Sequence, residues 1–319
     1  MKVMFAAPED AWGGILARFR EALPDVTFVA AGLNPKDLSG FDVVIPTMST
    51  LDRAVLETAD RLQLIQQIGA GLEAVDIPAA ESLGIAVANV PTDVSGNADS
   101  VAEMALLFML SLMRRAEAHP AQRENRRLGL PVGRSLHGAT VGLVGFGAIG
   151  QAISRRLRGF GARQIVVTRT PQAEQQAEFD LASLQSLAQL PELLAEADVV
   201  VLAVPDTEQT HHLMCADTFR LMKPGSYLIN VGRGGLVERE DLHEALQSGY
   251  LAGAGLDVFW KEPPDPNDPI FDLNVMTSPH VAGLTDRSVE GIMREAADNI
   301  RALEEGRPLK YLRSGGVSA

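Results

Sequence analysis

Three ionisable side chains, Arg233, Glu262 and His280, each lie in a short segment that also holds glycine or proline. Arg233 stands among glycines directly after an apolar run, Glu262 precedes a proline, and His280 follows one. An arginine can bind a carboxylate through two parallel hydrogen bonds, and a histidine beside a carboxylate can donate or accept a proton near neutral pH. With a dinucleotide loop upstream, these side chains predict hydride transfer to a 2-keto acid.

The dinucleotide loop lies in residues 141–150, which read Val-Gly-Leu-Val-Gly-Phe-Gly-Ala-Ile-Gly. The Gly-x-Gly-x-x-Gly pattern follows an apolar run and opens a helical one, which is the context that gives this motif its meaning. Its glycines permit a tight turn, a close approach to a pyrophosphate and close packing of helix on strand, and the helix start offers N–H groups to the anion. The predicted cofactor contacts in this loop are Gly145, Phe146, Gly147, Ala148, Ile149 and Gly150.

The end of the next predicted strand distinguishes NADP(H) from NAD(H). An NAD site usually carries Asp or Glu about 20 residues after the glycine loop, where it binds the ribose 2′-hydroxyl. Here the strand ends in Thr168, Arg169 and Thr170, without a carboxylate. Arg169 can bind a 2′-phosphate, and the threonines can donate their hydroxyls. We therefore predict a preference for NADP(H), with NAD(H) as the alternative cofactor. The competing interpretation is that Arg169 caps the edge of the sheet, is exposed to solvent and binds no cofactor.

Short apolar runs alternate with helical patterns along most of the chain, which is typical of parallel sheets covered by helices. A chain of 319 residues also exceeds the usual size of a single core, so two such domains are expected. The predicted strands cover residues 2–7, 26–30, 42–45, 62–68, 86–89, 141–144, 164–168, 199–203, 227–230, 254–257 and 275–277.

Helical spacing predicts a long helix over residues 97–114, with Asn97 as its N-cap, crossing between the domains. Further helices are expected over 15–23, 51–58, 151–160 and 289–303, and residues 114–135 are interpreted as a surface arm. The last helix is expected to return to the first domain. The predicted division is residues 1–98 and 287–319 for a substrate-binding domain, and residues 99–286 for a dinucleotide-binding domain.

The composition restricts the partners. With 28 Lys and Arg against 41 Asp and Glu, the net charge is −13, which argues against binding to nucleic acid or to an anionic membrane. The single cysteine, Cys215, excludes an internal disulfide and a cysteine-based metal cluster, and we expect no metal site. The sequence shows neither the apolar core of a signal peptide nor a run of 18 apolar residues, so a cytoplasmic, soluble protein is expected.

Of the six histidines, only His280 follows an apolar strand and precedes a glycine-containing turn. We expect His280 to donate a proton to the ketone oxygen as the hydride arrives, and Glu262 to orient the imidazole and favour its charged form. Arg233 follows a strand end, where ligands bind in parallel α/β sheets, and would bind the carboxylate and polarise the adjacent carbonyl. The other histidines lie in the arm, in a polar loop or on an exposed-looking helix.

These segments resemble the D-isomer-specific 2-hydroxyacid dehydrogenase family, and the resemblance covers nearly the whole chain. It includes residues 68–76, Ile-Gly-Ala-Gly-Leu-Glu-Ala-Val-Asp, and residues 97–103, Asn-Ala-Asp-Ser-Val-Ala-Glu. The resemblance implies two doubly wound parallel-sheet domains, a Rossmann coenzyme domain and a flavodoxin-like substrate domain. It further implies an active site in the cleft between them, and a homodimer built on the long helix.

The resemblance also implies roles for single residues. Arg233, Glu262 and His280 correspond to the family's catalytic residues, and the backbone N–H groups of Ala70 and Gly71 would bind the substrate carboxylate together with Arg233 and His280. The remaining implied cofactor contacts are Val204, Pro205, Thr210, Val231, Gly232, Asp257 and Gly283.

The strand end at residues 168–170 is similar to that of NADP-preferring glyoxylate and hydroxypyruvate reductases. A small 2-keto acid of that kind, with the D-2-hydroxy acid as its reduced form, is therefore the predicted substrate. Some of those reductases carry a tryptophan in the arm, which is absent here, whereas Trp260 stands beside the catalytic loop and is expected to shape the pocket.

Rival functions remain within the same fold. Formate dehydrogenases resemble the family with Gln in place of Glu262, and phosphite dehydrogenases resemble it with Lys in place of Ala70, so neither activity is expected. The alternative from another class is a binding module that uses NADP(H) as a conformational ligand and has little turnover.

Overall fold

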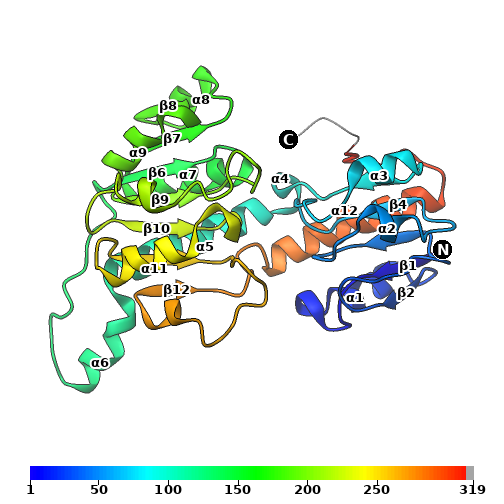
Figure 1. Ribbon diagram of the computed structural model, residues 1–319, viewed down its shortest axis with the longest axis horizontal. Helices are drawn as coiled ribbons and strands as arrows, with labels where there is room; N and C mark the ends of the chain where they lie inside the picture. The colour runs from blue at the N-terminus through cyan, green and yellow to red at the C-terminus, as the bar shows by residue number, and fades with distance from the viewer. Residues whose placement is uncertain (314–319) are drawn as a thin grey trace. The chain divides into compact units, whose positions relative to one another are not determined.

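The computed structural model describes residues 1–313, which form two compact α/β units (Figure 1). One unit holds Met1–Asn97 together with the chain from Leu284 onward, and the other holds Ala98–Gly283. Each unit contains one sheet, and every pair of neighbouring strands in both sheets is parallel. The predicted fold class of two doubly wound parallel-sheet domains is confirmed.

The five-stranded sheet of the first unit has the order β2-β1-β3-β4-β5, which is the flavodoxin-like order. Because the strands are parallel, their carboxyl ends share one edge of the sheet, and the loops at residues 46–50, 67–73 and 89–91 begin there. The strands are β1 (Lys2–Phe5), β2 (Thr27–Ala30), β3 (Val43–Ile45), β4 (Leu64–Gln66) and β5 (Ala86–Ala88).

Helices cover both faces of this sheet, because alternate strand residues point to opposite sides. Val3 and Phe5 pack in one core with residues of α1 and α12, whereas Met4 packs in the other with residues of α2 and α3. The helices of this unit are α1 (Ala11–Ala22), α2 (Arg53–Leu56), α3 (Ile77–Ser82), α4 (Thr92–Ser95) and α12 (Asp286–Glu304).

Several helix boundaries differ from the predicted ones, among them the starts of α1 and α7, and two of the differences have a local cause in a side-chain cap. The helix expected over 51–58 is only Arg53–Leu56, because the Asp52 side chain caps it by accepting from the Val55 N–H, and Leu51 forms a bridge with Val75. The predicted helix over 289–303 begins earlier, at Asp286, because Thr285 and Ser288 form a reciprocal capping box.

The seven-stranded sheet of the second unit has the order β12-β11-β10-β9-β6-β7-β8, which contains the Rossmann order. Strand β8 was not predicted, because its sequence, Ser-Leu-Gln-Ser, carries little apolar signal; it forms by parallel pairing with the edge of β7. The strands are β6 (Thr140–Val144), β7 (Arg163–Thr168), β8 (Ser183–Ser186), β9 (Val199–Leu202), β10 (Tyr227–Asn230), β11 (Gly253–Leu256) and β12 (Val275–Thr277).

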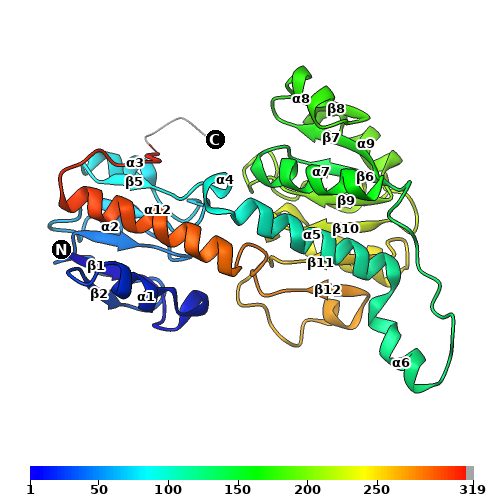
Figure 2. The ribbon, with the colours of Figure 1, turned by 180° about the vertical axis from the view of Figure 1, so that it is seen from behind.

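Helices α5 and α7 pack on one face of this sheet, as Figure 2 shows, and α9, α10 and α11 pack on the other. Asn97, expected as an N-cap, is already the first residue of α5, because Gly96 at φ +77° ends α4 directly before it. Residues 115–135, with α6, form an exposed arm. The helices are α5 (Asn97–Arg114), α6 (His119–Glu124), α7 (Ala148–Phe160), α8 (Ala173–Glu178), α9 (Leu190–Glu196), α10 (Ala216–Phe219) and α11 (Arg239–Gln247).

Five short segments complete the backbone description. Four are single 3₁₀ turns: Ala116–Ala118, Leu187–Gln189, Gly234–Leu236 and Pro269–Asp272. The fifth is the non-helical stretch Trp12 to Gly14 inside α1, where φ is positive at all three residues. Across residues 1–313, no helix has the length and apolar character that crossing a membrane requires.

Candidate active site

The glycine loop joins β6 to α7 in a conformation that only glycine permits at two positions. Gly145 has φ +104°, and a Cβ placed on it would lie 2.5 Å from the carbonyl oxygen of Ala203. A Cβ on Gly150 would collide with the carbonyl oxygen of Gly145. At Gly147, no heavy atom of the described chain lies within 4 Å of such a Cβ, so this side of the loop is open.

The first turn of α7 fits an anion. Gly147 is its N-cap and supplies no side chain, so the first N–H groups of the helix have no side-chain cap. The open space at Gly147 lies at this same helix start, and the helix dipole favours negative charge there. These features match what a dinucleotide pyrophosphate needs from the predicted loop.

The predicted selectivity residues lie beside this loop. Gly145 donates its N–H to the carbonyl oxygen of Val167 at 2.8 Å, so the last residue of β7, Thr168, directly follows the contact. Arg169 and Thr170 are exposed at the same carboxyl edge of the sheet. The structure therefore brings the three residues together with the glycine loop.

A second predicted cofactor segment begins after β9 and borders the glycine loop. A Cβ on Gly145 would lie 2.7 Å from Cγ1 of Val204, so the two loops are in contact. Thr210 holds the segment in a turn, because its hydroxyl donates to the Pro205 carbonyl oxygen at 2.7 Å and accepts from the Thr207 N–H at 2.8 Å. Val204, Pro205 and Thr210 thus belong to one compact loop.

The Arg233 loop follows β10 and is held by a buried amide. Asn230 donates from Nδ2 to the Arg233 carbonyl oxygen at 2.8 Å and accepts the Gly232 N–H at Oδ1, at 3.0 Å. Gly234 lies so close to the carbonyl of Phe259 that any Cβ would collide with it. The backbone around Arg233 is therefore fixed, and its half-buried guanidinium donates from Nη1 to the Gly232 carbonyl oxygen at 2.8 Å.

His280 and Glu262 form a direct pair. His280 Nδ1 lies 2.7 Å from Glu262 Oε2, and Oε1 of the same carboxylate accepts the Phe259 N–H at 3.0 Å. The His280 backbone has φ +55°, a left-handed conformation that a non-glycine residue keeps only when its surroundings hold it. Here its N–H donates to the carbonyl oxygens of Asp257 and Ser278. With Nδ1 bound to Glu262, Nε2 is the nitrogen through which His280 would exchange a proton with a ligand.

Opposing effects act on the Glu262 carboxyl. Burial raises its pKa, but the hydrogen bond and charge of His280, the Phe259 N–H and the charge of Arg233 outweigh burial, so the pKa lies below its ordinary value. Glu262 is therefore an anion at neutral pH. Because the charges of both His280 and Arg233 act on it, the three predicted catalytic side chains share one electrostatic environment.

Asp257 lies under the His280 segment. Its Oδ1 accepts from the Ser278 hydroxyl at 2.6 Å and from the N–H groups of Val281 and Ala282 at 2.9 and 3.0 Å. The residue is 2% exposed, and burial raises the pKa of its carboxyl despite these donors. Asp257 was predicted as a cofactor contact; in the structure its carboxyl binds the Ser278 side chain before His280 and the backbone N–H groups of the two residues after it.

The remaining predicted cofactor residues lie at nearby chain positions. Val231 and Gly232 are buried directly after β10, and Val231 packs in the core beneath α5 and α7. Gly283 is the last residue of this unit, one position after the Ala282 N–H that Asp257 binds. Trp260 is held against the core of the unit, where its Nε1 donates to the Val237 carbonyl oxygen at 2.6 Å.

The predicted carboxylate loop belongs to the first unit and follows β4. Ala70 is exposed and Gly71 is half-buried. The carbonyl oxygen of Ala70 accepts from Asn89 Nδ2 at 2.7 Å, and that of Gly71 accepts from Gln67 Nε2 at 2.9 Å. Gln67 and Asn89 were not among the predicted site residues, although each polar side chain directly follows a buried strand.

Sequence reasoning also missed a second carboxylate–imidazole pair. His211 Nδ1 lies 3.1 Å from Asp206 Oδ1, and both side chains abut Gly235, where a Cβ would collide with the Asp206 carboxylate. We assigned His211 to a polar loop, and an acid five residues earlier in that loop is the only sequence signal for the pair.

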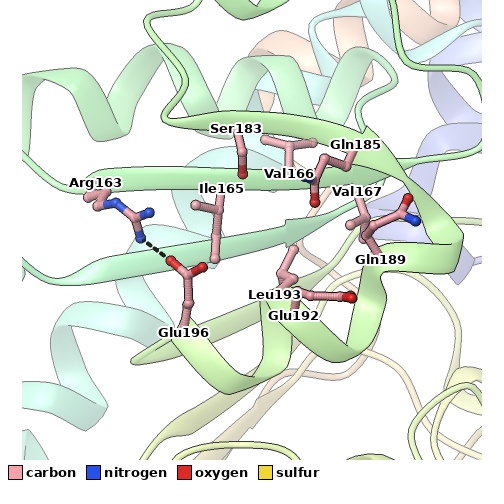
Figure 3. Close-up of a pocket in the computed structure, with 10 residues that line it drawn as sticks. All are labelled: Arg163, Ile165, Val166, Val167, Ser183, Gln185, Gln189, Glu192, Leu193 and Glu196. Carbon is pink, nitrogen blue, oxygen red and sulfur yellow. Dashed lines mark ion pairs between the residues drawn. The ribbon is translucent and has the colours of Figure 1, made fainter.

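A pocket of about 270 Å³ lies between β7, β8 and α9 (Figure 3), and none of the predicted site residues lines it. Its lining is largely polar and includes Ser183 and Gln185 of β8, and the ion pair of Arg163 with Glu196 at 2.7 Å stands at one end. Neither here nor elsewhere in residues 1–313 do three or more His, Cys, Asp or Glu form a group that could hold a metal ion.

Comparison with known proteins identifies the family. Residues 106–282 match the family model described as the NAD binding domain of D-isomer specific 2-hydroxyacid dehydrogenases. The chain is similar to the glyoxylate reductase of Thermococcus gammatolerans, at 37% identity over 278 residues that cover 83% of this chain and 80% of that protein.

Solved structures match over nearly the whole chain. The TT0316 protein of Thermus thermophilus is 33% identical, with a TM-score of 0.84, and the match covers 98% of this chain and 99% of that one. Granulicella M. formate dehydrogenase is 26% identical, with a TM-score of 0.87 and complete coverage of both chains.

Proposed function

Because the chain belongs to the D-isomer-specific 2-hydroxyacid dehydrogenase family, we propose that it reduces glyoxylate, hydroxypyruvate or a related small 2-keto acid with NADP(H). The chain is an NAD(P)-dependent 2-hydroxyacid dehydrogenase, and 2-keto acid reduction is the reaction of its class. The observation that carries the residue assignment is the anionic Glu262 carboxylate, bound to His280 and within the field of Arg233.

The unit Ala98–Gly283 binds the dinucleotide in this proposal, and the glycine loop with the residues around Thr168 and Val204 holds it. The nicotinamide, when bound, supplies the hydride that reduces the substrate carbonyl. The open helix start at Gly147 and the tight turn at Gly145 support this assignment.

The protein's own side chains supply the binding and the proton. Arg233 binds the substrate carboxylate and polarises the carbonyl next to it. His280 donates a proton from Nε2 to the developing alkoxide, and in the reverse direction takes it back. Glu262 holds the imidazole through Nδ1 and stabilises its positive charge, and the Phe259 N–H fixes the carboxylate in turn. From the family resemblance, the backbone N–H groups of Ala70 and Gly71 are also assigned to carboxylate binding.

The direct test is NADPH oxidation with a panel of 2-keto acids that includes glyoxylate, hydroxypyruvate and aromatic pyruvates. Turnover of a small member of the panel is expected. Tight NADPH binding without turnover on any 2-keto acid would instead support a binding module of the same fold. Oxidation of formate is not expected, because formate dehydrogenases of this fold have a glutamine at the position that Glu262 occupies here.

The cofactor preference has its own test. Arg169 is exposed beside the glycine loop, and the strand end carries no carboxylate to bind a ribose 2′-hydroxyl. Arg169→Ala should raise the KM for NADPH about tenfold or more, because a charge-assisted pair with the 2′-phosphate is lost, and should change the KM for NADH little. An equal effect on both cofactors would show that Arg169 acts only on the structure.

We also propose a homodimer. Large apolar side chains are exposed on α5 and on the arm, with Leu107 at 48%, Leu128 at 96% and Val132 at 79% exposed. Such a surface is typical of a protein interface. Light scattering should give twice the 34.1 kDa mass of the chain, and a monomer at micromolar concentration would contradict the proposal.

A further inference from the structure

Three consecutive carbonyl groups of the loop after β4 accept hydrogen bonds from strand-end residues of the first unit. The Gly69 oxygen accepts the Val90 N–H at 3.3 Å. The Ala70 and Gly71 oxygens accept from the side-chain amides of Asn89 and Gln67, at 2.7 and 2.9 Å. These carbonyl groups are therefore committed to the protein interior.

The direction of the carbonyl groups sets the direction of the next three N–H groups. In a planar trans peptide, the N–H of the following residue points opposite to the C=O. The N–H groups of Ala70, Gly71 and Leu72 therefore point away from Val90, Asn89 and Gln67. In the part of the chain that the structure describes, these three N–H groups donate to no protein acceptor. Successive N–H groups on one side of a loop form a concave site for an anion.

Gln67 uses its whole amide to hold this arrangement. Its Nε2 donates to the Gly71 oxygen and, at 2.8 Å, to the Thr47 oxygen, and its Oε1 accepts the Ile68 N–H at 2.9 Å. Thr47 lies in the loop after β3 and has φ +53°. One buried side chain thus ties together two loops at the carboxyl edge of the sheet.

Asn89 is held from the other side by the C-terminal segment. Its Oδ1 accepts from Arg313 Nε at 2.9 Å, and Arg313 donates its own N–H to the Val87 oxygen at 2.8 Å. The bond from Nδ2 to the Ala70 oxygen therefore starts from an amide whose orientation is already determined by Arg313.

We propose that Gln67 and Asn89 are positioning residues for substrate binding: they turn the carbonyl groups of the loop inward, so that the N–H groups of Ala70, Gly71 and Leu72 bind the carboxylate of the 2-keto acid. This inference rests on the proposed function. It adds Leu72 to the two donors that the family resemblance implies, and it assigns a binding role to two amides that do not themselves touch substrate.

Gln67→Met tests the proposal with Gln66→Met as its matched control. Both glutamines are buried, at 7% and 0% exposed, but the Gln66 amide bonds to the Gln67 oxygen and to Asn299 rather than to the loop. Gln67→Met should raise the KM for the 2-keto acid about ten- to a hundredfold, because the loop loses a donor and the Gly71 carbonyl is left to reorient. The NADPH dissociation constant should match that of the wild type, and kcat should stay within about threefold.

If Gln67 had only a structural role, Gln67→Met and Gln66→Met would lower the melting temperature and change the KM for the 2-keto acid by equal amounts. That result would overturn the proposal. Asn89→Asp is the second test, since it keeps the acceptor for Arg313 but removes the donor to Ala70. It should also raise the KM for the keto acid and leave NADPH binding unchanged. Wild-type protein without turnover on any 2-keto acid would overturn the proposed function, whereas wild-type turnover with an unchanged KM in Gln67→Met would overturn this inference alone.

Discussion

The unit Ala98–Gly283 contains two carboxylate–imidazole pairs, and both adjoin the Arg233 loop. In the first, His280 and Glu262 are 2.7 Å apart, with side chains 32% and 16% exposed. In the second, His211 and Asp206 are 3.1 Å apart, with side chains 54% and 26% exposed. Gly234 packs against the segment that leads to Glu262, and Gly235 packs against Asp206.

The two pairs differ most in what holds them. Glu262 accepts a backbone N–H with its second oxygen, and His280 is fixed by two backbone hydrogen bonds in a left-handed conformation. His211 instead stacks on His212, with ring centroids 4.0 Å apart, in an exposed loop. Because proton transfer requires an acid or base held in one geometry, residue type alone does not distinguish the pairs, whereas burial and anchoring do.

The largest expected effect separates the two histidines. His280→Ala should lower kcat about 10²- to 10⁴-fold and leave NADPH binding intact, because a positioned proton donor is removed. His211→Ala should keep kcat within about threefold, since its exposed pair resembles surface ion pairs of small energy. Steady-state kinetics on both variants measures the difference. Equal losses would place the acid/base chemistry in the exposed pair or in both.

Arg233→Ala should have the next largest effect, a loss of about a hundredfold in kcat/KM with a raised KM for the keto acid. The guanidinium both binds the carboxylate and polarises the carbonyl in the proposed mechanism. Arg239→Ala is the matched control. Arg239, the first residue of α11, donates a hydrogen bond to the Asp268 carboxylate and takes no part in that mechanism. A wild-type kcat/KM in Arg233→Ala would remove the loop from the active site.

The two carboxylates should differ by a smaller factor. Glu262→Gln should lower kcat about tenfold, because a neutral amide no longer stabilises the imidazolium, whereas Asp206→Asn should change kcat little. The reverse order of effects on kcat would invert the comparison between the pairs.

Glu262→Gln should also change acid stability. The pKa of Glu262 is below its ordinary value of 4.5 in the folded protein, so its stabilising contribution is present above that pH and is lost as the pH falls further. The difference in melting temperature between wild type and variant should therefore narrow below about pH 4.5. A constant difference down to the folded-state pKa would show that the pair has no such coupling.

Asp257→Asn should give the smallest effect, with the opposite pH dependence. Burial raises the pKa of Asp257 above its ordinary value of 3.8. The contribution of Asp257 to the free energy of unfolding therefore decreases as the pH rises from 3.8 through the raised pKa. An asparagine with its amide oxygen at the Oδ1 position keeps an uncharged acceptor for the donors that Oδ1 binds. The melting temperature of the variant should therefore rise relative to the wild type between acidic and neutral pH. If the melting temperature of Asp257→Asn instead falls relative to the wild type as the pH rises, the negative charge of Asp257 itself stabilises the His280 segment.

Much of the fold follows from local pattern. The strand positions and the glycine loop were predictable, because apolar runs and Gly-x-Gly-x-x-Gly are local signals, and the parallel architecture follows from the alternation of strands and helices. Strand β8 was missed because Ser-Leu-Gln-Ser has no strand pattern of its own and depends on pairing with residues 165–168. The first residues of α2 and α12 were missed because the side-chain caps at Asp52 and Thr285 determine where these helices begin.

The candidate site shows the same division. Arg233, Glu262 and His280 were identifiable from their types and their places after predicted strands, since the carboxyl ends of parallel strands lie at one edge. The sequence did not predict how these side chains contact one another. The 2.7 Å contact between Glu262 and His280 joins residues 18 positions apart, and loop geometry determines it. Gln67 and Asn89 carried no chemical signal of their own, since their donors act on backbone oxygens of other loops.

Residue types, their periodicity and their place after strands were thus enough to predict the family and the parallel sheets, and to propose candidate side chains for acid, base and anion-binding chemistry. Folding alone established which of two imidazole–carboxylate pairs is rigidly held, and which way the backbone of the loop after β4 points. The reason is that hydrogen-bond direction and burial depend on groups brought together from distant parts of the chain, and local sequence contains no record of that geometry.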